Sequence, residues 1–333
     1  MLKTNVKRRD LVLLYDVMDG SVNNDPDTNA PRQDPDTGIG SVSAECIKRK
    51  IRDEVAREKA GEPGYELLVA RGAVLNRAIR EAYEEASVKI PDAPKKPAKA
   101  AKAGKSGKSA SAPKDDEVAE DEEVGQERDQ RVSAADAARG NRRLVEKFFD
   151  ARWFGQVVTG VGAGRITGPV QIQEARSIVP VRIDEVARTR VATTNEEQSK
   201  AQKGLNQNRS RKARLSHALY KQMLHISPFQ ALTTGFSEKD FEVLLKALKS
   251  MFENDRSTSR GMVSMRQIVV FEHTDPLGSA RAVDLLNSVR VVPQVEAPTC
   301  FEQYTVTIDR STLPAGVIVT TAWPEATASA AAE

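Results

Sequence analysis

The chain has 333 residues and nearly balanced charge, with 50 lysines and arginines against 47 aspartates and glutamates, so its net charge of +3 singles out no class of partner. It holds no apolar run of about 18 residues, which excludes a membrane-spanning helix and gives no reason to expect a membrane partner. Cys46 and Cys300 follow neither a metal nor a disulfide spacing, so we expect a cytoplasmic protein with reduced thiols.

The start of the chain predicts a strand, a long loop and two helices. Residues 10–17 are apolar and β-prone, which predicts the strand. Residues 19–40 are rich in the turn formers Asp, Pro, Asn and Gly, which predicts the loop. One helix is predicted over 43–59, with Ser43 as its N-cap and an apolar residue at every fourth position, and a second over 72–88.

The composition then changes over residues 91–130. Seven lysines fall between 95 and 114 among Ala, Pro and Ser, and seven carboxylates follow between 115 and 123. A segment of this composition cannot bury enough apolar surface to form a core. We therefore predict a low-complexity, mobile insertion.

The elements predicted after the insertion alternate between helix and strand. They are a helix running toward a strand over 141–158, a Gly-rich turn into a strand over 159–181, a helix over 237–255, a strand over 264–273, a helix over 278–289, a strand over 300–309 and a final short apolar run. With the early strand and helix, this order favours an α+β domain with one main sheet.

Positive charge is concentrated between residues 198 and 237, which hold seven Lys/Arg, two His and no acidic residue. Further cations flank the apolar stripe of the helix over 43–59. Many Lys/Arg positions with few convergent polar groups suit a phosphate backbone, where affinity is summed over charges. Grooves of this kind bind single strands with little sequence preference.

Two aspartate repeats stand in the predicted loop, at residues 25–28 and 34–37. Each resembles part of a calcium-binding loop, but Ala30 and Ile39 stand where such a loop requires Gly. Asp-Pro dipeptides also set turns, in which the Asp side chain accepts hydrogen bonds from nearby backbone N–H groups. We therefore expect no metal site, and aspartates that shape the loop so that Arg32 and the face of residues 48–52 point toward one surface.

No motif for catalysis or for a cofactor is found. Cys46 stands beside apolar helix positions, so we expect a small packed residue and not a nucleophile. His217 and His225 lie in the cationic stretch and are expected at the surface or facing RNA rather than as metal ligands. The Gly-rich run from residue 159 fits no dinucleotide register. The sequence therefore predicts no catalytic residue and no cofactor.

Four blocks, in order along the chain, resemble one known family. The first, DPDTNAPRQDPDTGIGSVSAECIKRKIRDEV, resembles the N-terminal signature of the backbone subunit of type I CRISPR Cascade, in its type I-C form. Three later blocks resemble the same family: RWFGQVVTGVGAGRITGPVQIQEARSIVPV, TGFSEKDFEVLLKALKSMFENDRSTSRGMVSMRQIVVFEH and GSARAVDLLNSVRVV. Together they cover most of the chain outside 91–130 and the C-terminal tail.

The resemblance implies an α+β fold with an RRM-like (ferredoxin-like) palm and long thumb, finger and web insertions, in a single domain over residues 1–333. The thumb falls over 188–225. The implied function is to polymerise along a CRISPR guide RNA and present it in segments for pairing with a target DNA strand. The implied partners are neighbouring copies, the other Cascade subunits and a recruited helicase–nuclease that cuts in place of this chain, which is therefore not an enzyme.

The resemblance also implies which residues contact the guide RNA. They lie in the loop before the first helix, on that helix, near the Gly-rich turn and in the thumb. They are Arg32, Lys48, Arg49, Lys50, Arg52, Arg165, Arg176, Arg209, Arg211 and Lys212.

Two other functions remain open from the sequence. One is a backbone subunit that cleaves target RNA with a metal and a loop aspartate, for which Asp25, Asp27, Asp34 and Asp36 are the candidates. The other is a standalone RNA-binding protein that carries no guide.

Overall fold

The computed structural model describes residues 5–90, 132–158, 164–190 and 208–324, together with residues 197 and 200. The insertion predicted over 91–130 lies outside the described residues, and so do most of residues 191–207 of the predicted thumb. Among the described helices, none is long and apolar enough to cross a membrane.

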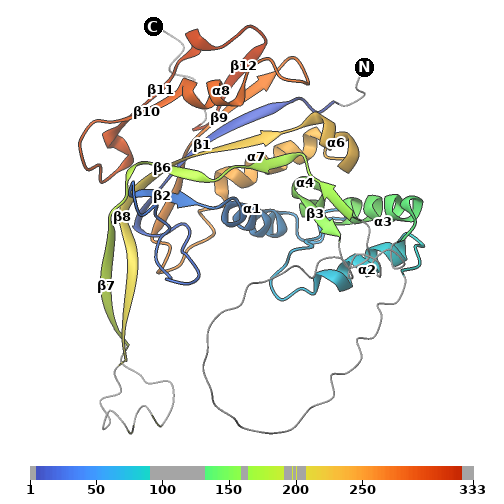
Figure 1. Ribbon diagram of the computed structural model, residues 1–333, viewed down its shortest axis with the longest axis horizontal. Helices are drawn as coiled ribbons and strands as arrows, with labels where there is room; N and C mark the ends of the chain where they lie inside the picture. Colours follow the sequence, from blue (N-terminus) through green and yellow to red (C-terminus); the bar gives the residue numbers. More distant parts are fainter. Residues whose placement is uncertain are drawn as a thin grey trace, which may run out of the picture.

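An antiparallel sheet of eight strands lies at the centre of the described part of the chain (Figure 1). Its strands are β1 (Arg9–Gly20), β2 (Ile39–Val42), β5 (Val170–Ile172), β6 (Ala175–Pro180), β7 (Ile183–Arg190), β8 (Asn208–Ile226), β9 (Met262–His273) and β12 (Val317–Trp323). The order across the sheet is β12-β9-β1-β8-β6-β2, and β5 and β7 also pair with β8. Two separate hairpins join β3 (Gly155–Val158) to β4 (Gly164–Thr167) and β10 (Val289–Pro293) to β11 (Tyr304–Ile308).

Helices and a hairpin cover the two faces of this sheet. The helices are α1 (Ala44–Glu58), α2 (Leu75–Glu85), α3 (Ala134–Lys147), α4 (Phe149–Phe154), α6 (Pro228–Thr234), α7 (Glu238–Ser250) and α8 (Ala282–Ser288). In Figure 1, α1 and α7 lie on one face, and α8 with the β10–β11 hairpin lies on the other. The mixed helix and antiparallel sheet architecture predicted from the sequence is confirmed.

The alternation of side chains in β1 explains why its sequence is a continuous apolar run. Leu11 and Leu13 join the core formed with α1 and α7, whereas Val12 and Leu14 join the core formed with α8, β10 and β11. A strand buried on both faces needs apolar residues at every position rather than at every second one.

Local capping signals fix the two helices on the first face. The Ser43 hydroxyl accepts a hydrogen bond from the Cys46 N–H, and Ser237 forms a capping box with Asp240. Asp240 also accepts hydrogen bonds from Arg152 and from the indole of Trp153, at 2.8 and 3.0 Å. The predicted N-cap Ser43 is therefore confirmed, and Asp240 of the capping box anchors α4 as well.

Helices α2 and α3 pack on each other beside the main sheet. Tyr83 of α2 lies against Gly140 of α3, where an added Cβ would lie only 2.3 Å from the ring. The contact therefore requires glycine at residue 140. The Tyr83 hydroxyl donates to Asn141 at 2.7 Å, which satisfies the polar end of this buried ring.

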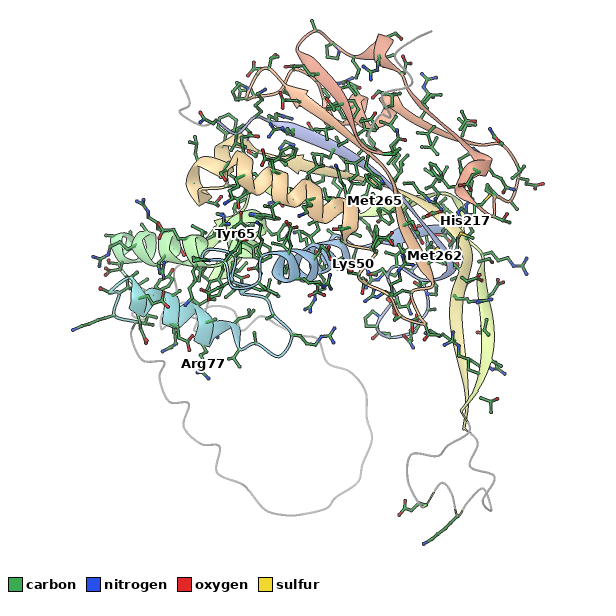
Figure 2. The ribbon with its side chains drawn as sticks, turned by 180° about the vertical axis from the view of Figure 1, so that it is seen from behind. Lys50, Tyr65, Arg77, His217, Met262 and Met265 are labelled. Atoms are coloured by element: carbon green, nitrogen blue, oxygen red, sulfur yellow. The ribbon has the colours of Figure 1, made fainter. Side chains whose placement is uncertain are left out.

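His217 and His225, which were predicted together, differ in how far their side chains are exposed. The side chain of His217, expected at the surface, is only 2% exposed and lies near the root of the β7–β8 hairpin (Figure 2). It faces the core of β10 and β11, because on β8 it alternates with side chains that face α1 and α7. His225 is one third exposed and meets His273 at a shared carboxylate, that of Asp10.

Asp10 links β1 to both of its neighbours in the sheet. Its two oxygens pair with Nδ1 of His225 at 2.9 Å and Nε2 of His273 at 2.8 Å. Nδ1 of His273 accepts from the Ser279 N–H, so Nε2 carries the proton and donates to Asp10. Burial raises the pKa of Asp10, but the two histidine hydrogen bonds outweigh it and lower this pKa to about 2.

We predict that Asp10 makes stability fall in acid. Because its folded-state pKa is depressed, its contribution is complete above the unfolded value of 3.8 and is lost as the pH falls through about 2. The difference in unfolding free energy between wild type and Asp10→Asn should therefore shrink by about 2 kcal/mol between about pH 4 and pH 2. Urea denaturation at several pH values measures it, and a constant difference would contradict the prediction.

Candidate nucleic-acid interface

The two aspartate repeats of the sequence form two similar turns in the structure. Oδ1 of Asp25 accepts hydrogen bonds from the backbone N–H groups of Asp27 and Thr28, at 3.0 and 3.1 Å. Oδ1 of Asp34 accepts from Asp36 and Thr37 in the same way, at 3.0 and 2.9 Å. The predicted turn-setting role of these two carboxylates is confirmed.

Each turn closes through a residue with positive φ. Asn29 has φ 56° and Gly38 has φ 70°, and each donates its N–H to the carbonyl of the aspartate that starts its turn, at 2.8 and 2.9 Å. Asn and Gly are the residues that adopt this backbone region most easily. The nine-residue spacing of the repeat therefore places two similar turns in succession between β1 and β2.

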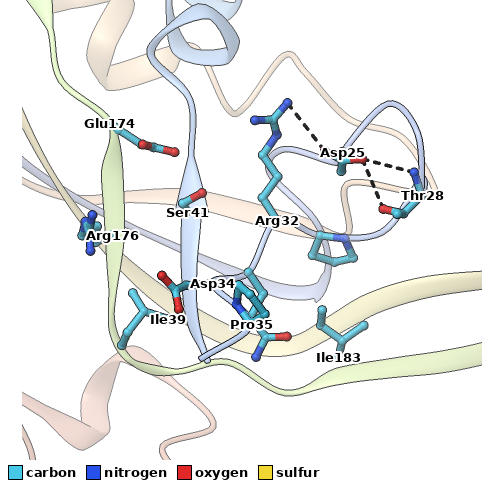
Figure 3. A pocket seen from close by; sticks show the side chains of 12 residues that line it. Asp25, Thr28, Arg32, Asp34, Pro35, Ile39, Ser41, Glu174, Arg176 and Ile183 are labelled. Atoms are coloured by element: carbon cyan, nitrogen blue, oxygen red, sulfur yellow. Dashed lines mark hydrogen bonds and ion pairs between the residues drawn. The ribbon is translucent and has the colours of Figure 1, made fainter. Parts of the chain in front are cut away.

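The two turns border a hollow of about 660 Å³ that also reaches β6 (Figure 3). Arg32 and Arg176, both predicted to contact RNA, line it together with Asp25, Asp34 and Glu174. Backbone hydrogen bonds, led by that of Thr37, lower the pKa of Asp34, and the charge of Arg176 contributes. The structure thus brings two predicted cations from distant segments to one site.

Arg32 and Arg176 differ in whether their side chains are paired with an acidic residue. Nη2 of Arg32 lies 4.0 Å from a carboxylate oxygen of Asp25, and its side chain is 36% exposed. Arg176 is exposed, and its side chain makes no hydrogen bond or close ion pair with the described residues. Arg176 is therefore the cation of the hollow that is most available to a ligand.

The cations of α1 do not form the single surface that the sequence predicted. Lys50 is only 3% exposed and pairs with Asp255, which lies between α7 and β9. Arg52 is 12% exposed, and its Nε lies 2.9 Å from Asp150 of α4. The prediction of one shared surface is wrong for Lys50 and Arg52, because acidic residues far away in the sequence hold them inside.

Lys48 and Arg49 remain partly accessible. Burial lowers the pKa of Lys48, whose Nζ lies 5.7 Å from the centre of the Phe154 ring. Arg49 pairs with Asp53 one turn along α1 at 2.9 Å and is 36% exposed. These two residues are the part of the predicted basic helix that a ligand could reach.

Two further arginines lie beside Arg49 and were not among the predicted contacts. Arg57 of α1 and Arg71 line a hollow of about 290 Å³ with Arg49. Arg57 stands eight residues after Arg49, which places it on the same face of the helix, so helical spacing could have identified it. No signal in the sequence brings Arg71 to this face.

The predicted thumb, residues 188–225, overlaps a long hairpin of β7 and β8 that begins five residues earlier, at Ile183 (Figure 1). Arg211 is 84% exposed and lies 3.6 Å from Glu185 on the partner strand. Lys212 donates to the Ser259 hydroxyl, and partial burial lowers the pKa of Lys212. Arg209 pairs with Thr189 through the backbone, and its side chain lies outside the description.

Arg165 lies at a different place from the other predicted contacts. It stands on β4 and lines a hollow of about 780 Å³ with residues of α3 and α6. This hollow shares no lining residue with the one at Arg32 and Arg176. The predicted RNA contacts are therefore distributed over separate surfaces, and their role in RNA binding stays a prediction.

The family model of CRISPR-associated protein Cas7 matches residues 7–309. The chain belongs to the Cas7 family. The resemblance found in the sequence is thus confirmed at the level of the family, and the type I-C form stays a prediction.

Solved structures that this Cas7-family chain resembles include two described as CRISPR RNA-guided surveillance complexes. A chain of the one marked "pre-nicking" is 15% identical, with a TM-score of 0.47, over 80% of this chain and 79% of its own length. A chain of the other is 11% identical, with a TM-score of 0.41, over 80% of this chain and 70% of its own. No curated protein matches the sequence.

We predict that Asp25 and Asp34 stabilise the loop between β1 and β2, and that this stabilisation needs no bound metal. Replacing either by Ala removes two backbone hydrogen bonds and should lower Tm by a few degrees. Asn retains the side-chain carbonyl acceptor and should lower Tm less. Thermal unfolding with and without millimolar calcium tests both points, and a calcium-dependent rise in wild-type Tm would contradict them.

Proposed function

We propose that this chain is a guide-RNA-binding backbone subunit of a CRISPR surveillance complex, of the type I-C form. The observation that carries the proposal is the Cas7 family match over residues 7–309. In this proposal copies of the chain line up along the guide with other subunits of the complex, in the cytoplasm, and hold the RNA so that it pairs with a target DNA strand.

The proposal includes an RRM-like palm. Along the chain, β1, α1, β5 with β6, β8, α7 and β9 follow the order strand, helix, strand, strand, helix, strand. Across the sheet, β9, β1 and β8 are neighbours, and β5 and β6 both pair with β8. The same order of elements occurs in the ferredoxin-like motif, which supports the proposal. The β7–β8 hairpin is then the thumb, and the segment from α2 to β4 supplies the finger and web insertions.

The distribution of exposed positive charge supports binding to the phosphate backbone of a nucleic acid. Arg176 and Arg211 are exposed, come from different elements and face solvent. Cations spread in this way give affinity through summed phosphate contacts and carry no base specificity. A protein that leaves sequence reading to base pairing needs such a grip.

A non-catalytic role is also part of the proposal. The alternative, a metal-dependent RNA-cleaving subunit, would need a loop aspartate free to bind metal. Of the four candidates, Asp25 and Asp34 already accept two backbone hydrogen bonds each through Oδ1, whereas Asp27 and Asp36 are exposed and are decided by the cleavage test below. Cutting of target DNA is then left to a recruited helicase–nuclease.

The RNA that co-purifies with the chain tests this function. We expect one RNA species of fixed length, because a guide has a defined length. A heterogeneous mixture would instead indicate a standalone RNA-binding protein. Incubation of the complex with complementary RNA and magnesium should give no cuts, whereas periodic cuts lost in Asp→Ala variants of the loop would establish the catalytic alternative.

Charge reversal at exposed arginines gives a second prediction. Arg176→Glu and Arg211→Glu should each weaken guide-RNA binding by about tenfold and reduce the slope of log affinity against log salt by about one. Arg281→Glu is the matched control, since Arg281 is 80% exposed on the α8 side of the molecule. Equal losses in all three variants would mean that only net charge matters.

A further inference from the structure

The connection between α7 and β9, residues 251–261, touches both elements that are predicted to hold RNA. Asp255 in this connection pairs through Oδ2 with Lys50 of α1 and through Oδ1 with Nε of Arg260, the latter at 2.8 Å. Glu54, one turn after Lys50, accepts from Asn254 at 3.0 Å. One end of the connection is therefore fixed to α1.

The other end of the connection is fixed to the root of the β7–β8 hairpin. The Ser259 hydroxyl accepts from Lys212 of β8, and the Thr258 carbonyl accepts from Arg188 of β7 at 3.5 Å. The Ser259 carbonyl also accepts from the Ser21 N–H at 3.0 Å. Both strands of the hairpin and the end of β1 thus contact the same short segment.

The backbone leaves little freedom at this junction. An added Cβ on Gly20 would lie 2.0 Å from the Arg260 carbonyl oxygen. Gly261 has φ +62°, and a Cβ there would lie 2.2 Å from the Met18 carbonyl oxygen. The connection is therefore packed directly against the end of β1, and Lys50 lies on the side of α1 toward the hairpin root (Figure 2).

We infer that residues 251–261 are a strut that sets the position of the β7–β8 hairpin relative to α1, with Asp255 and Lys50 as positioning residues. Lys50 acts through Asp255 and does not contact phosphate, since its side chain is 3% exposed and already paired. Where it concerns RNA, the inference rests on the proposed function. The ligand is single-stranded RNA, gripped at once by the accessible cations of α1 and by those of the hairpin.

The direction in which one substitution changes the affinity for RNA separates this positioning role from direct contact with phosphate. Asp255→Asn removes a negative charge and releases Lys50 and Arg260. If these cations bound phosphate directly, the variant would bind RNA more tightly. A strut predicts the opposite: affinity for the RNA that co-purifies with the wild type should fall by about tenfold, with an unchanged salt slope. Tighter or unchanged binding would overturn the inference.

A matched control lies in the same connection. Glu253 pairs with Arg256, both within residues 251–261, so Glu253→Gln removes the same charge without touching α1 or the hairpin. We expect Glu253→Gln to bind RNA as the wild type does. A loss equal to that of Asp255→Asn would show that net charge, and not the strut, is responsible.

A measurement without RNA keeps the strut testable if the proposed function fails. Spin labels at Glu45→Cys on α1 and Arg211→Cys on β8, in a chain with Cys46 and Cys300 replaced, report the distance between the two elements. The distance distribution should broaden in Asp255→Asn and in Ser259→Ala. The second change removes only the acceptor of Lys212 and no member of the ion pairs of Asp255. The distribution should stay narrow in Glu253→Gln. An unchanged distribution in both variants would overturn the inference, whereas absence of RNA from the wild type would overturn only the proposed function.

Discussion

The fold depends on the complete enclosure of β1. This strand pairs with β8 along one edge and β9 along the other, and its side chains alternate between two separate cores. Each neighbour is therefore positioned by β1, and β8 continues beyond the sheet as one strand of the projecting hairpin. The end of β1 also starts the double turn and meets the strut. The loop that carries Arg32 thus follows directly from β1, and the hairpin that carries Arg211 includes β8, the strand that pairs with β1.

Local signals made several elements predictable. Strand β1 is a run of apolar residues, and α1 and α7 begin at Ser43 and Ser237 with the spacing of a buried stripe behind them. The double turn was predictable for the same reason, since an aspartate and the backbone it binds are two or three residues apart. Each of these features is decided within a few residues, where sequence patterns carry the information.

The sequence could not show which lysines and arginines are exposed and which are paired, because their acidic partners are far away along the chain. Lys50 is paired by a residue 205 positions later, and Arg52 by one 98 positions later. Helical spacing shows which side chains share a face but not which carboxylate the fold brings to them. Strand β7 escaped prediction because its polar, charged sequence lacks the apolar alternation of a half-buried strand. It is formed by pairing with β8, away from the cores.

The enclosure of the sheet has a consequence for how bases are treated. An RRM that reads RNA stacks bases on aromatic side chains of an open sheet face. Here α8 and the β10–β11 hairpin occupy one face, while α1 and α7 occupy the other. Among the described residues, this sheet therefore offers no open face on which bases could stack. Under the proposed function, the chain would then hold a guide RNA by its sugar–phosphate backbone, and the Watson–Crick edges would stay free to pair.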